Sequence, residues 1–225
     1  MLVRETENIE VYLYQIEIEN TRHITNTYVL KDKATNKLVV IDPAFDGKRI
    51  KETIKDLGEL ESVIVTHSHA DHIAGLADLV NGTNINVYIH PLDKEGLWNA
   101  TFNEQQVVGT NVKLVEKERI CVVEDESEIK VGNTSLLTMH TPGHTQGSMM
   151  VYNEKENVLF SGDTIFKNTY GRTDLITSSH EDMGKSLDKI FAKFKNISVY
   201  SGHGPMFELE DSKRIIKMLY AVKGF

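Results

Sequence analysis

The stretch VIVTHSHADHIAG, from Val63 to Gly75, places the strongest constraint on this chain. It begins with β-branched residues that indicate a buried strand, and three histidines and one aspartate follow within six positions. The chain has nine histidines among 225 residues, so chance rarely gives such a cluster. Burying the rings for packing alone would leave ring nitrogens without hydrogen-bond partners. The stretch therefore predicts a metal site at the end of a strand.

The spacing within this stretch divides the candidate ligands into two pairs. His67 and His69 are two residues apart, so on an extended segment their rings project to the same side and can bind one ion. Asp71 and His72 follow where we expect a helix to begin, and the free N–H groups and positive end of that helix favour a carboxylate. One strand-to-helix loop thus supplies four candidate ligands.

Three further candidates each follow a predicted strand. His144 comes after a Pro-Gly turn in HTPGHTQGS, Asp163 ends an apolar strand in FSGDTIF, and His203 lies in SGHGP. The C-terminal ends of strands are where α/β folds collect their chemistry. These three side chains therefore extend the candidate ligand set to seven.

Composition limits the class of protein and its partners. The chain is 40% hydrophobic and carries 25 basic and 33 acidic residues, and no segment gathers Lys and Arg, so nucleic acid is not an expected partner. Cys121 is the single cysteine, and its alternating segment RICVVEDE predicts a half-buried strand thiol. The N-terminal MLVRETENIEVYLY lacks the apolar run of a signal peptide or membrane span. We therefore expect a cytoplasmic protein that does not bind membranes.

The pattern along the chain indicates one α/β domain over residues 1–225, because no linker or low-complexity tract interrupts it. Hydrophobic periodicity predicts strands at 10–19, 23–31, 37–41, 62–66, 86–90, 128–131, 134–140, 148–153, 157–161 and 197–201. It predicts helices at 47–58 and 71–80, from Pro91, and at 181–194 and 208–222. Residues 99–125 show no clear pattern. We expect residues 92–126 to cover part of the active site, although a packing role fits them almost as well.

A possible internal repeat bears on the fold. NTYVLKDKATNKLVVID, Asn26–Asp42, and GSMMVYNEKENVLFSGD, Gly147–Asp163, are both seventeen residues long, apolar at the ends and turn-forming in the middle. SVIVTH later ends at His67, and SVYSGH ends at His203. Hairpins of similar length also arise without duplication. A true repeat predicts two similar halves whose sheets pack face to face with helices outside, and strand-end residues of both halves then meet at one rim.

The motif order resembles that of the metallo-β-lactamase-fold hydrolases, and within them the glyoxalase II-like group. THSHADH, TPGHTQGS, SGDTIF with GRTDL, and SGHGP stand in the family's order between residues 66 and 205, and the NTYVL…VVIDPA hairpin also fits. The resemblance implies a four-layer αββα sandwich. It implies a first ion bound by His67, His69 and His144, a second bound by Asp71, His72 and His203, and a bridging Asp163.

Such a site would carry out metal-dependent hydrolysis. Two divalent ions about 3.5–4 Å apart share a water, lower its pKa from about 15.7 towards about 7, and supply a bridging hydroxide as the nucleophile. Asp71 would orient this nucleophile or accept its proton. The nitrogen and oxygen ligands suit zinc, iron or manganese, and zinc is the metal we expect first.

The resemblance to glyoxalase II implies a small-molecule thioester or ester substrate. The 22 residues after His203 cannot supply the C-terminal helical domain with which longer members bind glutathione, so recognition of glutathione stays open. The alternative is a persulfide dioxygenase-like enzyme with one iron, because HADHIAG and GRTD also resemble that group. SGHGP has the hydrolase form and favours hydrolysis. A non-catalytic metal-binding member would have lost ligands, and all seven are present.

The remaining polar residues are expected to have supporting roles. We expect packing or surface roles for His23, His90, His140 and His180, and His140 has the alternative of fixing the tautomer of a ligand. Asp42 is expected either to orient an imidazole or to end a strand in a turn. Arg172 and Asp174 are expected to pair near the mouth of the site, with substrate contact by Arg172 or Tyr170 as the alternative.

Overall fold

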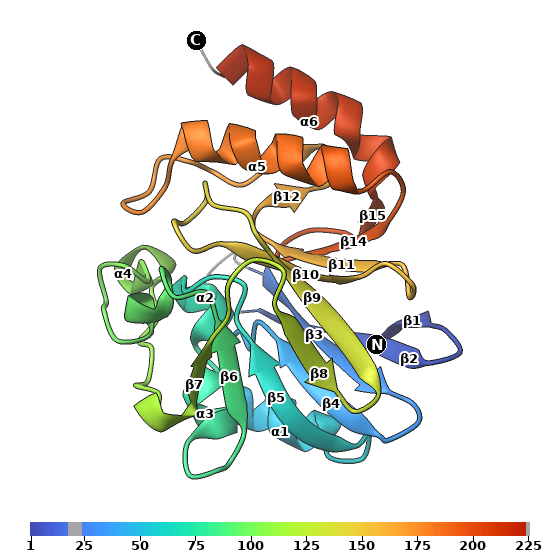
Figure 1. Cartoon of the computed structure of the whole chain (residues 1–225). Helices are drawn as coiled ribbons and strands as arrows, with labels where there is room; N and C mark the ends of the chain where they lie inside the picture. The colour runs from blue at the N-terminus through green and yellow to red at the C-terminus, as the bar shows by residue number, and fades with distance from the viewer. Residues whose placement is uncertain (18–23, 224–225) are drawn as a thin grey trace.

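Two β-sheets pack face to face with helices on both outer sides, which confirms the predicted four-layer αββα sandwich (Figure 1). The computed structural model describes residues 1–17 and 24–223. The first sheet has the order β1 (Leu2–Glu5), β2 (Ile9–Glu17), β3 (Ile24–Asp32), β4 (Lys37–Ile41), β5 (Glu59–Ile64), β6 (Asn86–Ile89) and β7 (Ile120–Val122). The second has the order β15 (Phe207–Glu208), β14 (Ser198–Ser201), β11 (Val158–Gly162), β10 (Met149–Asn153), β9 (Thr134–His140) and β8 (Glu128–Val131). A short hairpin joins β12 (Ile165–Phe166) to β13 (Thr169–Tyr170).

The repeat predicted from the sequence appears as the centre of each half. β3 pairs with β4 and β10 pairs with β11 as antiparallel hairpins. In each half a helix follows, and the next strand returns parallel to the hairpin, β5 beside β4 and β14 beside β11. The crossovers are made by α1 (Gly47–Ile54) and α5 (His180–Lys193). Both halves therefore direct the ends of these parallel strands to one rim of the sandwich.

Alternation along the strands divides the apolar residues among three cores. On β4, Val39 and Ile41 face the space between the sheets, and Leu38 and Val40 face the outer helices. The inner core includes Tyr28, whose ring lies 5.4 Å from that of Phe160 on the other sheet, measured between centroids. Full burial of one such apolar side chain contributes roughly 1.5–3 kcal/mol. The inner core therefore fixes how the two halves are placed.

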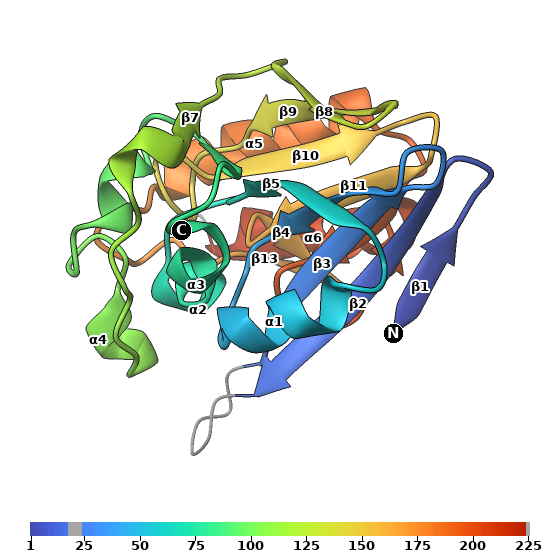
Figure 2. The same cartoon turned by 90° about the horizontal axis from the view of Figure 1, so that it is seen from below.

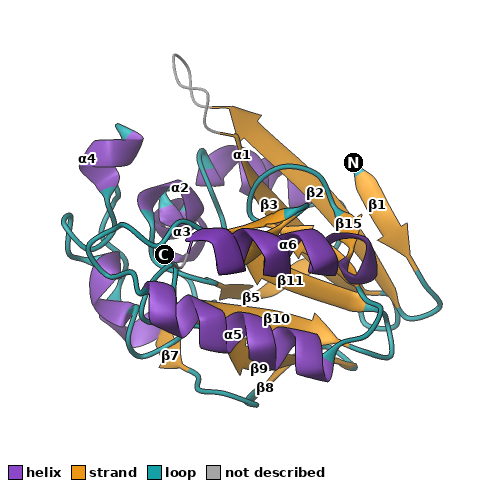
Figure 3. Cartoon of the chain, turned by 90° about the horizontal axis from the view of Figure 1, so that it is seen from above, coloured by secondary structure: helices purple, strands orange, loops and turns teal. Residues whose placement is uncertain are grey.

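Helices cover the outer face of each sheet. α1 and α3 (Leu76–Val80) pack on the first sheet (Figure 2). α5 and α6 (Leu209–Lys223) lie over the second sheet (Figure 3). Ser179 caps α5 by accepting the N–H of Asp182, and Met183, Leu187 and Ile190 bury the inner face of that helix.

The helix expected at 71–80 is interrupted at Gly75. It forms α2 (Ala70–Ile73) and α3 as two short helices. The Gly75 N–H donates to the carbonyls of Pro43 and Ala44 in the loop after β4, and a Cβ at this position would lie 2.8 Å from the Ala44 oxygen. A tertiary contact therefore ends α2 where local propensity favours a continuous helix.

Other differences fall in short elements. The helix expected from Pro91 is a 3₁₀ turn, η1 (Lys94–Leu97), and residues 99–125 contain α4 (Gln105–Val108), η2 (Lys117–Arg119) and β7. The helix expected at 47–58 ends at Ile54, and β1 was not expected. Residues 18, 19 and 23 of the expected strands lie outside the described residues. Cys121 is partly buried on β7, as predicted. Within residues 1–17 and 24–223, no helix combines the length and apolar character needed to cross a membrane.

Candidate metal centre

The seven predicted ligands meet at the rim where strands of both halves end. The loop after β5 provides His67 and His69, and α2 provides Asp71 and His72. The second half provides the other three, from the β9–β10 loop, the end of β11 and the end of β14: His144, Asp163 and His203. Six of the seven side chains are buried, and His203 is 30% exposed.

The first cluster consists of His67, His69 and His144, which bring one ring nitrogen each within 4.8 Å of the others. His69 Nδ1 lies 2.9 Å from His144 Nε2. His144 donates its Nδ1–H to the Arg172 carbonyl at 3.0 Å, so its Nε2 lone pair points into the cluster. His67 Nε2 is buried and has no hydrogen-bond partner among the residues that the structure describes. A bound cation would satisfy these nitrogens.

The second cluster consists of Asp71, His72 and His203. Asp71 Oδ2 lies 3.2 Å from His203 Nε2 and 3.5 Å from His72 Nε2. Asp163 stands between the clusters, with Oδ2 at 3.6 Å from His144 Nε2 and 3.3 Å from His203 Nε2. Its carboxylate therefore reaches both groups of nitrogens.

Fixed hydrogen bonds orient the rings of the second cluster. His203 donates from Nδ1 to the Ile24 carbonyl at 2.8 Å. His72 donates from Nδ1 to Asp42 Oδ2 at 3.0 Å. In both rings Nδ1 carries a proton for this hydrogen bond, so Nε2 is the nitrogen directed at the cluster and is the atom that would bind a metal.

Asp42 orients an imidazole, which is one of the two roles expected for it. Besides His72, its carboxylate accepts the Thr66 N–H and the Thr66 hydroxyl, both at 2.7 Å. A carboxylate oxygen of Asp42 also lies close enough to ring nitrogens of His67 and His72 to form a third group of potential metal ligands. Because three hydrogen-bond donors already occupy the Asp42 oxygens, this residue stabilises the ligand-bearing loop instead.

The two clusters differ in electrostatic character. Burial, together with the neighbouring histidines, lowers the pKa of His67 well below its usual value and that of His69 to about 3. In the second cluster burial also opposes the charged rings, but adjacent carboxylates outweigh it and raise the pKa of His72 to about 10 and that of His203 to about 11. Burial opposes the charge of Asp163 as well, yet His203 and His72 hold its pKa well below the usual range.

The donor set suits divalent metal ions. It combines imidazole nitrogens with carboxylates, and the carboxylates balance the charge of a buried cation. The buried, unpartnered His67 Nε2 is satisfied by such an ion. The nature of the donors is compatible with zinc, iron or manganese.

Comparison with known proteins identifies the family. The model of the Metallo-beta-lactamase superfamily matches residues 20–203. The chain belongs to this superfamily. It is 31% identical over 172 residues to the probable metallo-hydrolase YqgX of Bacillus subtilis, which covers 76% of this chain and 81% of that protein. It is 30% identical over 178 residues to the probable polyketide biosynthesis zinc-dependent hydrolase PksB of Bacillus subtilis, covering 78% of this chain and 71% of the relative.

A solved structure supports the same membership. The B3 metallo-beta-lactamase BLEG-1 superposes with a TM-score of 0.78 at 29% identity, covering 89% of this chain and 95% of that one. The superfamily fold therefore extends over most of the chain, including all seven candidate ligands.

Three of the other four histidines of this superfamily member, His90, His140 and His180, make their ring contacts outside the clusters. His90 and His140 stack on each other with ring centroids 3.9 Å apart, and His140 Nε2 lies 3.0 Å from the Gln146 carbonyl oxygen. His140 thus packs rather than fixing a ligand tautomer. His180 stacks on Tyr220 at 4.6 Å. His23 lies outside the described residues.

A cavity of about 340 Å³ opens over the clusters. Five of the ligands line it, and its other walls are formed by Glu104, Val107, Val108, Phe166, Arg172 and Leu175. The expectation that residues 92–126 cover the site thus holds for Glu104 and α4. Trp98 packs elsewhere and donates its indole N–H to the Val115 carbonyl. Arg172 and Asp174 form the predicted pair, with Nε 2.7 Å from Oδ1.

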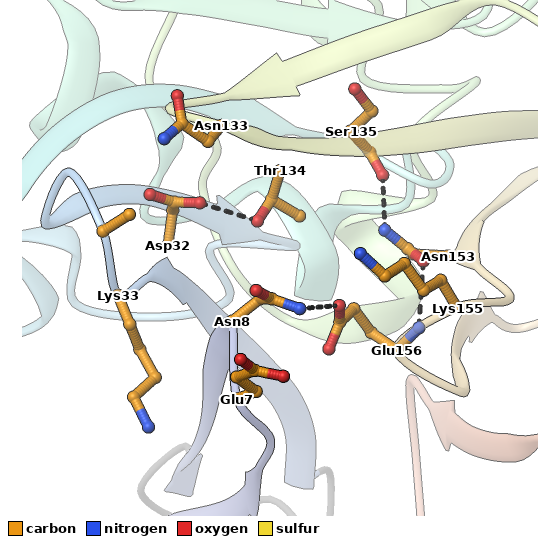
Figure 4. Close-up of a pocket in the computed structure, with 11 residues that line it drawn as sticks. Glu7, Asn8, Asp32, Lys33, Asn133, Thr134, Ser135, Asn153, Lys155 and Glu156 are labelled. Carbon is orange, nitrogen blue, oxygen red and sulfur yellow. Dashed lines mark hydrogen bonds between the residues drawn. The ribbon is translucent and has the colours of Figure 1, made fainter.

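A larger cavity of about 560 Å³ lies where the β3–β4, β8–β9 and β10–β11 turns meet (Figure 4). Its buried carboxylates already have partners. Asp32 accepts a hydrogen bond from Thr134, and Glu156 accepts one from Asn8 at 2.7 Å (Figure 4). The lining within the described residues contains no histidine or cysteine, so this cavity does not compete with the rim as a metal site.

The two aspartates that close the repeated hairpins should respond differently to substitution. We expect Asp163→Asn to abolish stoichiometric metal binding at both clusters, because its carboxylate reaches both. We expect Asp42→Asn to retain metal but to weaken its affinity or slow turnover by about 10–100-fold, as for groups that orient a ligand. Metal content after dialysis measures the difference. Equal metal loss in the two variants, or full retention in Asp163→Asn, would contradict these roles.

Metal uptake by the two clusters should depend on pH in different ways. At pH 7 the raised pKa values of His72 and His203 keep their rings protonated in the metal-free protein, so an entering ion must displace those protons. Affinity at the second cluster should therefore rise about tenfold per pH unit for each proton displaced. His67 and His69 are already neutral, so an ion displaces no proton from these two rings and affinity at the first cluster should depend less steeply on pH than affinity at the second.

Titration calorimetry in buffers of different ionisation enthalpy measures these displaced protons. His203→Ala and His144→Ala assign each binding step to a cluster. Zinc uptake without proton release at pH 7 would be the contrary result.

Proposed function

We propose that this metallo-beta-lactamase superfamily member is a glyoxalase II-like hydrolase that binds two divalent ions and cleaves a thioester or an ester. The observation that carries the proposal is the position of Asp163, whose Oδ2 lies within 3.6 Å of ring nitrogens from both clusters. A carboxylate in that position suits a bridging ligand. The similarity to YqgX and PksB supports hydrolysis, and the zinc-dependent description of PksB favours zinc.

The residues of the metal centre have different roles in the proposed hydrolysis. Two bound divalent ions would lower the pKa of a shared water and polarise the acyl carbonyl. Asp71 orients the attacking water or accepts its proton, and the Thr25 hydroxyl fixes this carboxylate by donating to Oδ2 at 2.9 Å. The three hydrogen bonds to His72, His144 and His203 fix the rings, so the ligand geometry is set before substrate enters.

The walls of the cavity favour a substrate with an apolar acyl group. Val107, Val108, Phe166 and Leu175 line the space above the clusters. Val107 is 62% exposed at its mouth, where an apolar ligand would cover it. Among the described residues of this lining, Arg172 provides the one guanidinium, so the site offers few cations for a leaving group with two carboxylates such as glutathione.

The proposed partners follow from charge and composition. The net charge of −8 disfavours nucleic acid, and the proposed ligand is a small molecule. A single cysteine suits a reducing compartment, so we propose that the protein acts in the cytoplasm.

Metal analysis combined with substrate assays tests the proposal. We expect up to two transition-metal ions per chain, hydrolysis of acyl thioesters such as S-lactoylglutathione or a hexanoyl thioester, and loss of that activity with a chelator. An active metal-free protein would exclude the mechanism. One iron per chain with oxygen-dependent turnover of glutathione persulfide, and no hydrolysis, would support the persulfide dioxygenase alternative instead.

A charge placed on the apolar wall should weaken substrate binding without disturbing the metal. We expect Val107→Asp to raise KM for a hexanoyl thioester about tenfold, which corresponds to about 1.4 kcal/mol of lost binding. Val222→Asp on α6 is the matched control, because Val222 is a similarly exposed valine outside the cavity lining. An unchanged KM in Val107→Asp, or an equal rise in both variants, would argue against an acyl group on this wall.

A further inference from the structure

A buried aspartate outside the ligand set joins the two loops that carry the first cluster. Asp93 follows β6 at the start of η1 and is 4% exposed. Its Oδ2 accepts the Ser68 N–H at 2.8 Å and the Thr145 hydroxyl at 2.9 Å, and its Oδ1 accepts the Gly147 N–H at 2.7 Å. All three donors belong to the ligand-bearing loops rather than to the ligand rings.

The position of these donors relates Asp93 to one cluster. Ser68 stands between His67 and His69, and Thr145 directly follows His144. The first loop comes from the half built on the first sheet, and the second loop comes from the other half. One carboxylate therefore joins a loop of the first half to a loop of the second half. The three ring nitrogens of the first cluster come from these same two loops.

Close packing leaves this carboxylate little freedom. A Cβ at Gly147 would lie 2.5 Å from the Asp93 nitrogen and 2.6 Å from its Oδ1. A Cβ at Gly96, one turn further along η1, would overlap the Ser68 side chain. The β9–β10 loop and the β5–α2 loop thus both press against the segment that carries Asp93.

We propose that Asp93 is a positioning residue that sets the spacing between the His67–His69 pair and His144 and thereby the metal affinity of the first cluster. The inference rests on the proposed metal-binding function. It does not require that the substrate be a thioester. Asparagine at this position would retain the shape of the side chain but turn an NH₂ donor towards the N–H or O–H groups that the carboxylate now accepts, so at least one loop would shift.

The opposite end of the sandwich supplies a matched control. Asp32 is 2% exposed, and its Oδ1 accepts the Thr35 N–H at 2.8 Å and the Thr35 hydroxyl at 2.7 Å. Its Oδ2 accepts the Thr134 hydroxyl at 2.8 Å, so it also joins the two sheets (Figure 4). Asp32→Asn therefore disrupts a similar set of buried hydrogen bonds far from the ligand loops.

The experiment measures metal affinity rather than turnover alone. Wild type, Asp93→Asn and Asp32→Asn are freed of metal, their thermal unfolding is recorded, and each is titrated with Co²⁺ and with Zn²⁺ against a competing chelator. His144→Ala and His203→Ala assign the Co²⁺ absorption bands to the first and second clusters. We expect both Asn variants to lose thermal stability, but Asp93→Asn alone to weaken the first cluster, by about 10–100-fold.

A second pair of variants keeps the test decisive if Asp93→Asn fails to fold. Thr145→Val removes one donor to Asp93, and Thr145→Ser retains it. We expect Thr145→Val to weaken the first cluster and Thr145→Ser to restore affinity close to that of wild type.

Three outcomes would overturn the proposal. They are wild-type affinity at the first cluster in folded Asp93→Asn, the same loss in Asp32→Asn, or equal weakening of both clusters. If Asp93→Asn does not fold, equal affinity in the two Thr145 variants overturns it. A wild-type protein that binds metal but hydrolyses no ester or thioester would contradict the proposed function, whereas the selective loss in Asp93→Asn would still support the role of this residue.

Discussion

The seam between the two halves is the constraint on which the rest of the structure depends. Each metal-ligand cluster takes two side chains from the first half and one from the second. The His67–His69 pair needs His144, and the Asp71–His72 pair needs His203. The relative placement of the sheets, set by inner-core contacts such as Tyr28 against Phe160, therefore fixes the distances between ligand atoms. An ion bound across this seam stabilises the packing of the halves by the same free energy with which the packing favours the ion.

Electrostatics adds a second constraint at this seam. Buried carboxylates require positive charge, and in the metal-free protein the rings of His72 and His203 supply it through their raised pKa values. The first cluster consists of imidazoles, and two of them, His67 and His69, stay neutral because their pKa values are lowered. The two clusters therefore differ before an ion binds: the first offers imidazole lone pairs, and the second is a network of ion pairs.

Much of this arrangement could be predicted from local sequence. The strand positions follow from apolar alternation, and the four ligands between His67 and His72 are close in sequence, so their proximity needs no knowledge of the fold. The equal hairpins that end at Asp42 and Asp163 indicated two halves with a common rim. The roles of these two aspartates differ because the Asp42 oxygens are occupied by Thr66 and His72, whereas those of Asp163 face both clusters.

The features that sequence analysis missed depend on contacts between distant segments. Asp93 accepts hydrogen bonds from two main-chain N–H groups and one hydroxyl, and no residue pattern in the sequence predicts such partners. The break at Gly75 arises from carbonyls of the loop after β4. Residues 92–126 were expected to cover part of the site, but the sequence did not single out Glu104 and α4 as the lining part, because the composition of this segment resembles that of any surface loop.

The use of main-chain carbonyls to hold two of the ligand rings has a consequence for how this enzyme can diversify. Arg172 and Ile24 orient His144 and His203 through their backbone oxygens. The orientation of the two rings therefore does not depend on the side chains of Arg172 and Ile24. Other residues can therefore replace Arg172 at the rim of the cavity during evolution, and His144 would keep the same tautomer. A fold that anchors its chemistry on backbone atoms leaves its substrate-facing side chains open to adaptation, and new specificities can arise there without rebuilding the catalytic core.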